Sequence, residues 1–293
     1  MESSALQSPA SHPADSPDPA LPVVRLAGVA VHALRATQAV GHIVDSARRG
    51  RGGWVVTPNL DILRRLVHEP GFAQLCDGAT LRLADGMPLV WASRLQRTPL
   101  PERVAGSDLI WSLSKAAADA ALRVFLLGGN PGAADAAAEI LRRRFPALVI
   151  AGTHCPPVGF ESNPDLRRAV DTALNAADPH VVFVALGSPK QEKLIRELRG
   201  LFPGIWFLGI GISFSFVSGE VRRAPRWMQR IGLEWSHRLM QEPQRLFRRY
   251  LLDGVPFAVR LLVASFLAGL RHGDPTNRET VESSRSSLGD RGP

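Results

Sequence analysis

The 293-residue sequence has little cysteine and no long apolar run. Cys76 and Cys155 stand far apart, without CxxC or Cys/His spacing, so neither a disulfide framework nor a zinc site is indicated. We expect two buried thiols. The apolar run Leu261–Leu270 has ten residues, well short of the roughly 20 that a membrane-spanning helix needs. This run predicts a helix that does not easily cross a bilayer.

Several catalytic motifs are also missing. The sequence contains no Asp-x-Asp, HExxH, GxSxG or GxxxxGK[ST] motif. Their absence argues against metal-dependent glycosyl transfer, zinc proteolysis, serine hydrolysis and P-loop NTP hydrolysis. A GxGxxG motif followed by an acidic residue about 20 positions later is absent too, which weakens the case for an NAD-type oxidoreductase.

Lysine is scarce, and arginine carries the positive charge. The chain has 35 Lys and Arg against 27 Asp and Glu, a net charge of +8, but only three of the basic residues are lysine. Residues 219–260 contain nine arginines and four acidic residues, so this region supplies +5 of the +8. A regional basic patch indicates an anionic partner: nucleic acid, acidic lipid headgroups or a phosphorylated substrate.

Composition divides the chain into four segments. Residues 1–22 are rich in Pro, Ser and Ala and lack the basic and apolar regions of a signal peptide. We therefore expect a disordered tail and a protein that stays in the cytosol. Residues 23–218 predict an α/β domain, residues 219–272 a helical appendage, and residues 273–293 a second disordered tail.

Apolar strand-like segments alternate with helical segments in the α/β domain. The predicted strands are 54–57, 124–127, 149–151, 181–186 and 205–208, and the predicted helices include 60–68, 131–145 and 164–177. Strands without polar alternation are buried on both faces. The pattern therefore predicts a Rossmann-like parallel sheet covered by helices.

Glycine turns follow three of these strands, at Gly128-Gly129, Gly187-Ser188 and Gly209-Ile210-Gly211. A single glycine after a strand is more often a simple turn. Ligands bind to parallel sheets at the carboxyl ends of the strands, and helix N-termini there attract anions. The three turns together favour a phosphate-bearing ligand.

Asp85 is the first candidate for chemistry. It follows the apolar segment Leu81–Ala84 and precedes Gly86-Met87-Pro88. It is a turn former or the N-cap of the helix at Pro88, or it points into the ligand cleft, where burial would raise its pKa and suit it for general-base work. In the next candidate group, Lys190-Gln191-Glu192, Lys190 and Glu192 belong either to a solvated first helical turn or to the site.

Pro225, Pro243 and Pro256 each stand at a plausible helix start, which divides the C-terminal region into three short helices. The first two combine arginine with Trp, Phe and Tyr. These helices pack on the sheet domain or a neighbouring subunit with a solvated arginine face, attach to a membrane surface, or bind nucleic acid. Arginine suits bidentate phosphate contact and favours the membrane, whereas no motif supports nucleic acid.

Six ordered blocks resemble the WecB/TagA/CpsF glycosyltransferases over roughly residues 23–262. The blocks are Thr57-Pro58-Asn59, Ala84–Met87, Pro101–Leu109, Gly128–Gly132, Leu186–Glu192 and Arg223–Trp227. The resemblance implies inverting, metal-independent transfer of a sugar from a UDP-sugar to a polyprenyl-diphosphate-linked sugar, without a cofactor. It implies a peripheral enzyme at the cytoplasmic membrane face that serves exopolysaccharide, capsule or wall polymer biosynthesis. The implied donors are of the N-acetylmannosamine, N-acetylmannosaminuronic acid or glucose type.

The resemblance also implies roles for individual residues. Asp85 would deprotonate the acceptor, Gln191 would lie near the reacting centre, Thr57 and Asn59 would hold the sugars, and Arg103 would face phosphate. The strand ends add the substrate-binding candidates Gly128, Gly129, Gly187, Lys190 and Glu192. The arginines expected at the lipid diphosphate or membrane are Arg222, Arg223, Arg226 and Arg230.

One block departs from the family pattern. Where Gly-Val-Gly-Gly and then Phe-Asp are common, this chain has Ile212 in place of glycine and Ser215 in place of aspartate. A missing carboxylate affects the donor contact, so the donor sugar does not follow from the resemblance. The departure motivates an alternative, a non-catalytic nucleotide-sugar-binding or membrane scaffold protein. The oligomeric state is left open, a homo-oligomer included.

Overall fold

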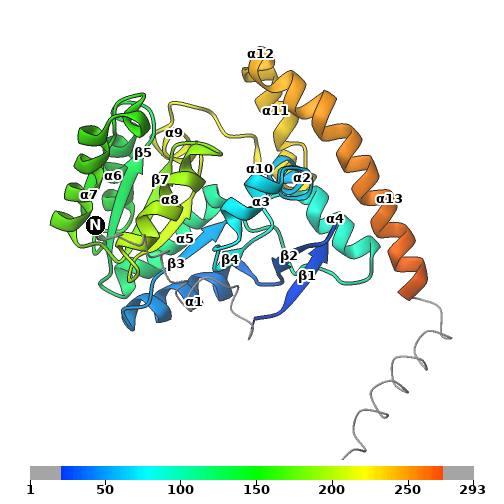
Figure 1. The fold of residues 1–293 in the computed structure, drawn as a ribbon, viewed down its shortest axis with the longest axis horizontal. Helices are drawn as coiled ribbons and strands as arrows, with labels where there is room; N and C mark the ends of the chain where they lie inside the picture. Colours follow the sequence, from blue (N-terminus) through cyan, green and yellow to red (C-terminus); the bar gives the residue numbers. More distant parts are fainter. Residues whose placement is uncertain (1–20, 273–293) are drawn as a thin grey trace, which may run out of the picture.

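Six parallel strands form the central sheet of the computed structural model, which describes residues 21–272 (Figure 1). The strand order is β4-β3-β8-β7-β5-β6, and all five pairings are parallel, as the apolar strands predicted. The strands are β3 (Gly53–Val56), β4 (Leu81–Arg82), β5 (Arg123–Gly128), β6 (Val149–His154), β7 (Val181–Ala185) and β8 (Trp206–Gly209). Strands β1 (Val23–Leu26) and β2 (Val29–His32) form a separate antiparallel hairpin.

Helices cover both faces of the sheet. The first face is covered by α1 (Ala36–Arg48), α5 (Gly106–Asp119), α6 (Ala133–Arg144) and α9 (Ser213–Ser218). The second is covered by α2 (Leu60–His68), α3 (Pro70–Cys76), α7 (Pro164–Ala177) and α8 (Lys190–Leu201). The four inner strands β3, β5, β7 and β8 therefore lie between two apolar layers, which explains why their sequences show no polar alternation.

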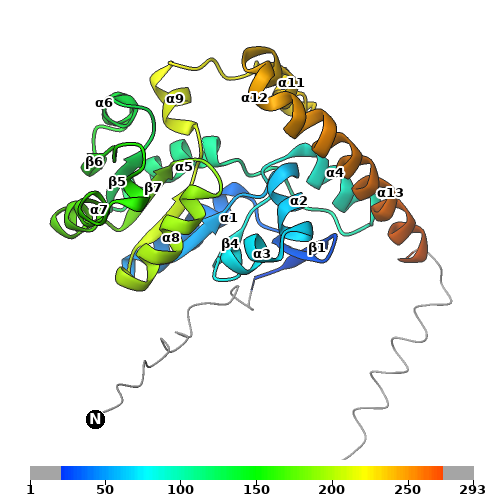
Figure 2. The same cartoon turned by 45° about the horizontal axis from the view of Figure 1, so that its top comes forward.

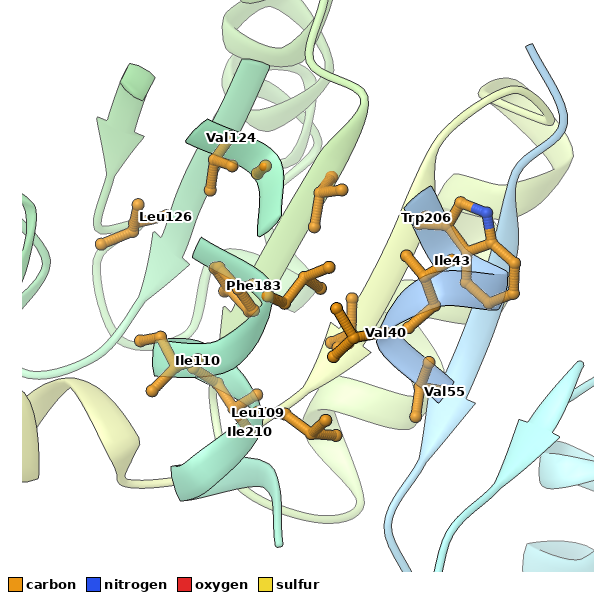
Figure 3. Close-up of a cluster of buried hydrophobic side chains, with 14 of the residues drawn as sticks. Val40, Ile43, Val55, Leu109, Ile110, Val124, Leu126, Phe183, Trp206 and Ile210 are labelled. Carbon is orange, nitrogen blue, oxygen red and sulfur yellow. The ribbon is translucent and has the colours of Figure 1, made fainter. Parts of the chain in front are cut away.

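Successive residues of one strand point to opposite cores because the side-chain period of a strand is two. Val181 and Phe183 of β7 join the first cluster, whereas Val182 and Val184 join the second. Figure 3 shows Phe183 and its neighbours from α1, α5 and the adjacent strands in the first cluster. Burying each such side chain fully contributes about 1.5–3 kcal/mol. This packing fixes the carboxyl edge of the sheet as a rigid platform.

The glycine turns at the strand ends need glycine for geometric reasons. Gly128 and Gly129 have φ values of +91° and +87°, and Gly187 has +72°. These lie in the left-handed region that side chains rarely adopt. A Cβ on Gly128 would also come within 2.8 Å of the Ala185 carbonyl oxygen. The turns therefore have a structural role whether or not a ligand uses them.

The C-terminal helices form a layer at one end of the sheet. They are α10 (Arg226–Arg230), α11 (Glu234–Gln241), α12 (Pro243–Phe247), the π-helical turn η2 (Arg248–Gly254) and α13 (Val255–His272). Helix α13 lies along α4 (Met87–Leu95), as Figures 1 and 2 show. Phe257 and Leu261 of α13 join a third apolar cluster with the β1–β2 hairpin, α2 and α4. The appendage is thus anchored to the sheet domain by apolar packing.

The prediction of three short C-terminal helices is wrong in two respects. The first expected helix is interrupted at Gly232, so α10 and α11 are separate. The second and third run on through Pro256, because this proline lies in the first turn of α13, directly after the π-helical turn. The resulting helix, Pro243–Arg271, has 29 residues, and its most apolar 18-residue window has a mean hydropathy of 1.8 and is 22% buried. By length and composition alone it could cross a membrane, which the ten-residue apolar run did not indicate.

The remaining domain boundaries stay predictions. The predicted tails at 1–22 and 273–293 lie outside the described residues, apart from Leu21 and Pro22. Helix α9 ends at Gly219, which has a φ of +81°, close to the predicted start of the appendage.

Candidate active site

A cleft of about 700 Å³ lies at the carboxyl edge of the sheet. One side is lined by residues that follow β3, β4, β5, β6, β7 and β8, and the other by residues of α11, α12, η2 and α13. Figure 2 shows these C-terminal helices beside α2 and α4. The cleft occupies the position where parallel α/β sheets bind their ligands, so the glycine turns correctly indicated its place.

Asp85 lies in this cleft, immediately after β4. Its backbone N–H donates to the Pro58 carbonyl at 2.8 Å, which ties it to the end of the neighbouring strand β3. Gly86, not Asp85, is the N-cap of α4, so the capping interpretation is wrong. Burial, helped by the nearby carboxylates of Glu234 and Asp108, raises the pKa of Asp85 to about 7, although Arg103 and Arg223 oppose the shift. A carboxyl group that titrates near neutral pH suits a general base.

Arg103 and Arg223 form a closed ring of ion pairs with Asp108 and Glu234 beside Asp85. Arg103 donates to Glu234 at 2.9 Å and to Asp108 at 3.0 Å. Arg223 donates to Glu234 at 3.0 Å and to Asp108 at 2.5 Å. Asp85 approaches the ring only through Arg103, at 3.9 Å between Oδ1 and Nη1. Arg103 therefore lines the cleft, but its guanidinium already pairs with carboxylates.

Thr57 and Asn59, at the end of β3, also line the cleft. Thr57 is buried. The Asn59 Oδ1 atom accepts the Ile62 N–H at 3.0 Å and so caps helix α2. Asn59 therefore has a structural role alongside its predicted contact with a sugar.

Gln191 is buried and organises the loop after β8. Its Oε1 accepts the Gly211 N–H at 3.1 Å, and its Nε2 donates to Glu192 at 3.1 Å. Glu192 is buried too, and burial raises its pKa, so a solvated first turn is wrong for this residue. Lys190 pairs with Glu161 at 2.9 Å at the cleft wall.

The glycine candidates lie at the strand ends as expected. Gly129 and Gly187 line the cleft, and Gly128 precedes Gly129 at the end of β5. The Gly129 N–H donates to the Ala185 carbonyl at 2.6 Å, which joins the ends of β5 and β7. The turns after neighbouring strands are thereby held together at one edge.

The appendage arginines that line the cleft are not the four that the sequence analysis expected at the lipid diphosphate or the membrane. The four predicted arginines are absent from its lining: Arg222, Arg223, Arg226 and Arg230. Besides Arg103, the arginines that line it are Arg238, Arg245 and Arg249, from α11, α12 and η2. Arg226 and Arg230 line a separate groove of about 450 Å³ next to α4. The sequence showed that the region was basic but not which helix face turned inward.

The three arginines in the cleft each have a carboxylate neighbour. Arg238 and Arg245 contact Glu242 at 3.4 Å and 2.6 Å, and Arg249 contacts Asp61 at 3.0 Å. Three guanidinium groups thus share two carboxylates, which leaves this wall with a net positive charge. Such a wall suits an anionic ligand.

A carboxylate lies beside Ser215 despite the departure from the family pattern. Ser215 Oγ donates to Glu220 at 2.8 Å, and Asn130 Nδ2 donates to the other oxygen of Glu220 at 2.6 Å. Glu220 stands five residues after Ser215, is exposed and does not itself line the cleft, whereas Ser215 and Asn130 do. Sequence comparison at position 215 alone does not reveal this group.

The donor set of the cleft contains no obvious metal site. Among residues 21–272, no group of three or more His, Cys, Asp or Glu side chains could hold a metal ion. The charged side chains that line the cleft are five cationic groups and four carboxylates: Arg103, Lys190, Arg238, Arg245 and Arg249, with Asp61, Asp85, Glu161 and Glu234.

The fold and the site define an α/β protein whose cleft combines a carboxyl group of raised pKa with a cationic helical wall. The model of the Glycosyl transferase WecG/TagA/CpsF family matches residues 24–270. The chain belongs to this family and is a glycosyltransferase.

Two curated relatives have high similarity to this chain. An N-acetylglucosaminyldiphosphoundecaprenol N-acetyl-beta-D-mannosaminyltransferase of Bacillus spizizenii (strain ATCC 23059 / NRRL B-14472 / W23) is 36% identical over 203 residues, which cover 69% of this chain and 76% of the relative. A protein of the same name from Bacillus subtilis (strain 168) is 34% identical over 194 residues, covering 66% and 73%.

Proposed function

We propose that this glycosyltransferase moves a sugar from a UDP-sugar to a polyprenyl-diphosphate-linked N-acetylglucosamine, with inversion and without a metal. The relatives are named for the transfer of N-acetylmannosamine to such an acceptor, and this supports the acceptor class. The single observation that carries the proposal is the position of Asp85, a carboxyl group with a pKa of about 7 that faces an arginine-lined wall across one cleft.

In this mechanism Asp85 accepts the proton of the acceptor hydroxyl group. The hydroxyl oxygen then forms a bond to the anomeric carbon of the donor sugar, while the bond from that carbon to UDP breaks and its electron pair leaves with UDP. The N–H groups at the helix starts behind the glycine turns and the cationic side chains of the cleft stabilise the departing diphosphate. Attack from the face opposite UDP inverts the anomeric centre.

The acceptor diphosphate belongs at the cationic wall in this proposal. Arg238, Arg245 and Arg249 come from the helices that also carry the exposed apolar surface, so a lipid chain and its diphosphate could be held by the same segment. Arginine matches phosphate oxygens with two parallel hydrogen bonds.

A donor screen tests the proposed reaction. The purified protein is incubated with a short-chain polyprenyl-diphosphate N-acetylglucosamine and a panel of UDP-sugars, and UDP release is measured together with the lipid product. Turnover with one donor supports the proposal, and the absence of lipid product with every donor contradicts it. Activity that disappears in EDTA and returns with a divalent ion would contradict the metal-independent mechanism.

The activity should fall as the pH drops through about 7. Asp85 accepts a proton only when ionised, and burial raises the pKa of this carboxyl group from its ordinary value of 3.8 to about 7. The acidic limb of kcat/KM against pH should therefore have its midpoint near pH 7, with full activity above it. A midpoint near pH 4 would mean that a carboxyl group of ordinary pKa carries the reaction.

We also propose peripheral attachment to the cytoplasmic membrane face through one side of α13. Val255, Val259, Val263 and Leu267 are exposed and four residues apart, so they lie along one strip of the helix. The opposite side of α13 buries Phe257 and Leu261 against the sheet domain. Helix α13 is apolar on both sides, but the sheet domain covers only one of them. The uncovered apolar side is therefore suited to contact with a membrane.

Charge placed on the exposed strip should release the protein from vesicles. Phe266 is exposed next to this strip. We expect the combined substitution Val263→Glu, Phe266→Glu and Leu267→Glu to lower binding to anionic phospholipid vesicles at least about tenfold, because it exposes charge to the acyl boundary. Flotation with the vesicles measures the bound fraction. Val149→Glu, at an exposed position at the start of β6, is the matched control and should bind normally. Equal binding of the triple variant would exclude α13 as the anchor.

A further inference from the structure

The Arg103 guanidinium lies between two carboxylates, those of Glu234 and Asp85. Its Nη1 atom lies 2.9 Å from Glu234 Oε2 and 3.9 Å from Asp85 Oδ1. The shorter distance is a charge-assisted hydrogen bond, and the longer is a contact between charges without a hydrogen bond. Glu234 and Asp85 therefore compete for the same nitrogen, and Glu234 has the closer position.

The rest of the ion-pair ring holds this arrangement in place. Asp108, at the start of α5, binds the second terminal nitrogen of Arg103, and Arg223 joins Asp108 to Glu234 from the other side. The Val104 N–H donates to the Ala84 carbonyl at 2.7 Å, which fixes the Arg103 backbone next to Asp85. Arg103 therefore cannot move far from Asp85, and the carboxylates around it decide where its guanidinium points.

Glu234 belongs to the appendage, whereas Asp85, Arg103 and Asp108 belong to the sheet domain. It is the first residue of α11, and its side chain is about one fifth exposed. The charged groups acting on Asp85 are Arg103 and Asp108 of the sheet domain and Arg223 and Glu234 of the appendage. Of the two appendage groups, only Glu234 is a carboxylate. The appendage thus contributes a charge directly to the surroundings of the proposed base.

We propose that Glu234 is a positioning residue that holds the Arg103 guanidinium away from Asp85 and so keeps the Asp85 carboxylate available to the acceptor hydroxyl. This inference rests on the proposed function of Asp85 as the base. The proposed role makes the docking of α11 part of the assembly of the active site. Without Glu234, Arg103 would pair with Asp85, the proposed base.

The substitution Glu234→Gln separates this role from simple packing. Glutamine has nearly the same shape as glutamate but no charge, so the Nη1 atom of Arg103 loses its charged partner. The guanidinium is then expected to pair with Asp85. Loss of the Glu234 charge and a guanidinium at hydrogen-bond distance both favour the ionised carboxylate, so the Asp85 titration midpoint should fall by about one pH unit or more. A weaker base should also lower kcat by up to about tenfold while the KM for the UDP-sugar stays the same.

The experiment measures the titration of Asp85 without requiring turnover. Full-length protein is labelled with ¹³C at the aspartate carboxyl groups, and the Asp85 resonance is identified by its absence from the Asp85→Asn variant. Its midpoint is compared in the wild type, Glu234→Gln and the control Asp253→Asn. Asp253 is an acidic residue of the same segment with no ion pair among the described residues, so its removal should leave the midpoint unchanged. The acidic limb of kcat against pH is recorded for the same three proteins.

Each outcome decides one of the two proposals. A lowered midpoint in Glu234→Gln alone supports the positioning role, even if no donor gives turnover and the proposed function fails. An unchanged midpoint overturns it, even if kcat falls, because a loss of activity without a change in titration is a structural effect. If Glu234→Gln does not fold, as judged by circular dichroism, Glu234→Asp replaces it. The shorter side chain withdraws from Arg103, so a smaller fall of the midpoint is expected, and no fall overturns the role.

Discussion

The Asp85→Asn variant is expected to lose sugar transfer by about 10²–10⁴-fold, the contribution of a positioned general base. Asparagine keeps the size of the side chain but cannot accept the proton of the acceptor hydroxyl. UDP should still bind, because the glycine turns and the helix starts around the cleft do not depend on the Asp85 charge. Chromatography of the product measures the loss of transfer, and calorimetry with UDP measures whether UDP still binds.

The stability of the same variant serves as its folding control. Because burial raises the pKa of Asp85 above the ordinary value of 3.8, the folded state disfavours the ionised form. This stability cost is absent below about pH 4 and grows as the pH rises to about 7, above which it is complete. Asp85→Asn should therefore unfold at an equal or higher temperature than the wild type at pH 8. Full transfer activity in the variant would remove Asp85 as the base.

The second large effect is expected at the cationic wall. Combined substitution of Arg238, Arg245 and Arg249 by glutamine should lower kcat/KM for the lipid-diphosphate acceptor by about 10²-fold or more, since each hydrogen bond to a charged group contributes about 1.5–3 kcal/mol. The KM for the UDP-sugar should change little if these side chains bind the acceptor. Initial rates at varied acceptor and donor concentrations separate the two constants.

A second pair of arginines provides the matched control for that experiment. Arg226→Gln with Arg230→Gln removes two arginines of the same region that lie outside the cleft, in the groove beside α4. We expect near-normal transfer to a short-chain acceptor in solution. If this control loses as much activity as the triple variant, the effect reflects the overall charge of the segment and not the cleft wall.

The sheet and the position of the cleft were predictable from the sequence. Val181–Val184 and Val124–Leu127 are apolar at every position, which only a strand covered on both faces requires, and both proved to be central strands. The helix predicted from Pro164 matches α7, whose start is capped by the Asn163 side chain. These features depend on residues that are close together in the sequence, so the sequence is enough to predict them.

Predictions of where the C-terminal helices begin and end were less accurate. The break at Gly232 and the continuation through Pro256 depend on what the helices pack against, since Gly232 lies against Met87 and Trp91 of α4 and α13 is held by Phe257. The sequence therefore showed that the segment is rich in arginine but not which of its arginines line the cleft. Glu234 gave no signal in the sequence, because a single glutamate at a helix start is ordinary until its neighbours in space are known.

By itself the sequence determined the parallel sheet, the regional positive charge and Asp85 as the candidate base, because each rests on residue type and short-range order. Tertiary structure alone decided which arginines face the cleft and that Glu220 brings a carboxylate to Ser215. It also decided that Glu234, 149 residues after Asp85 in the chain, shares Arg103 with it. Charges act through space, so the electrostatics of the site follow from the packing of α11 on the sheet domain.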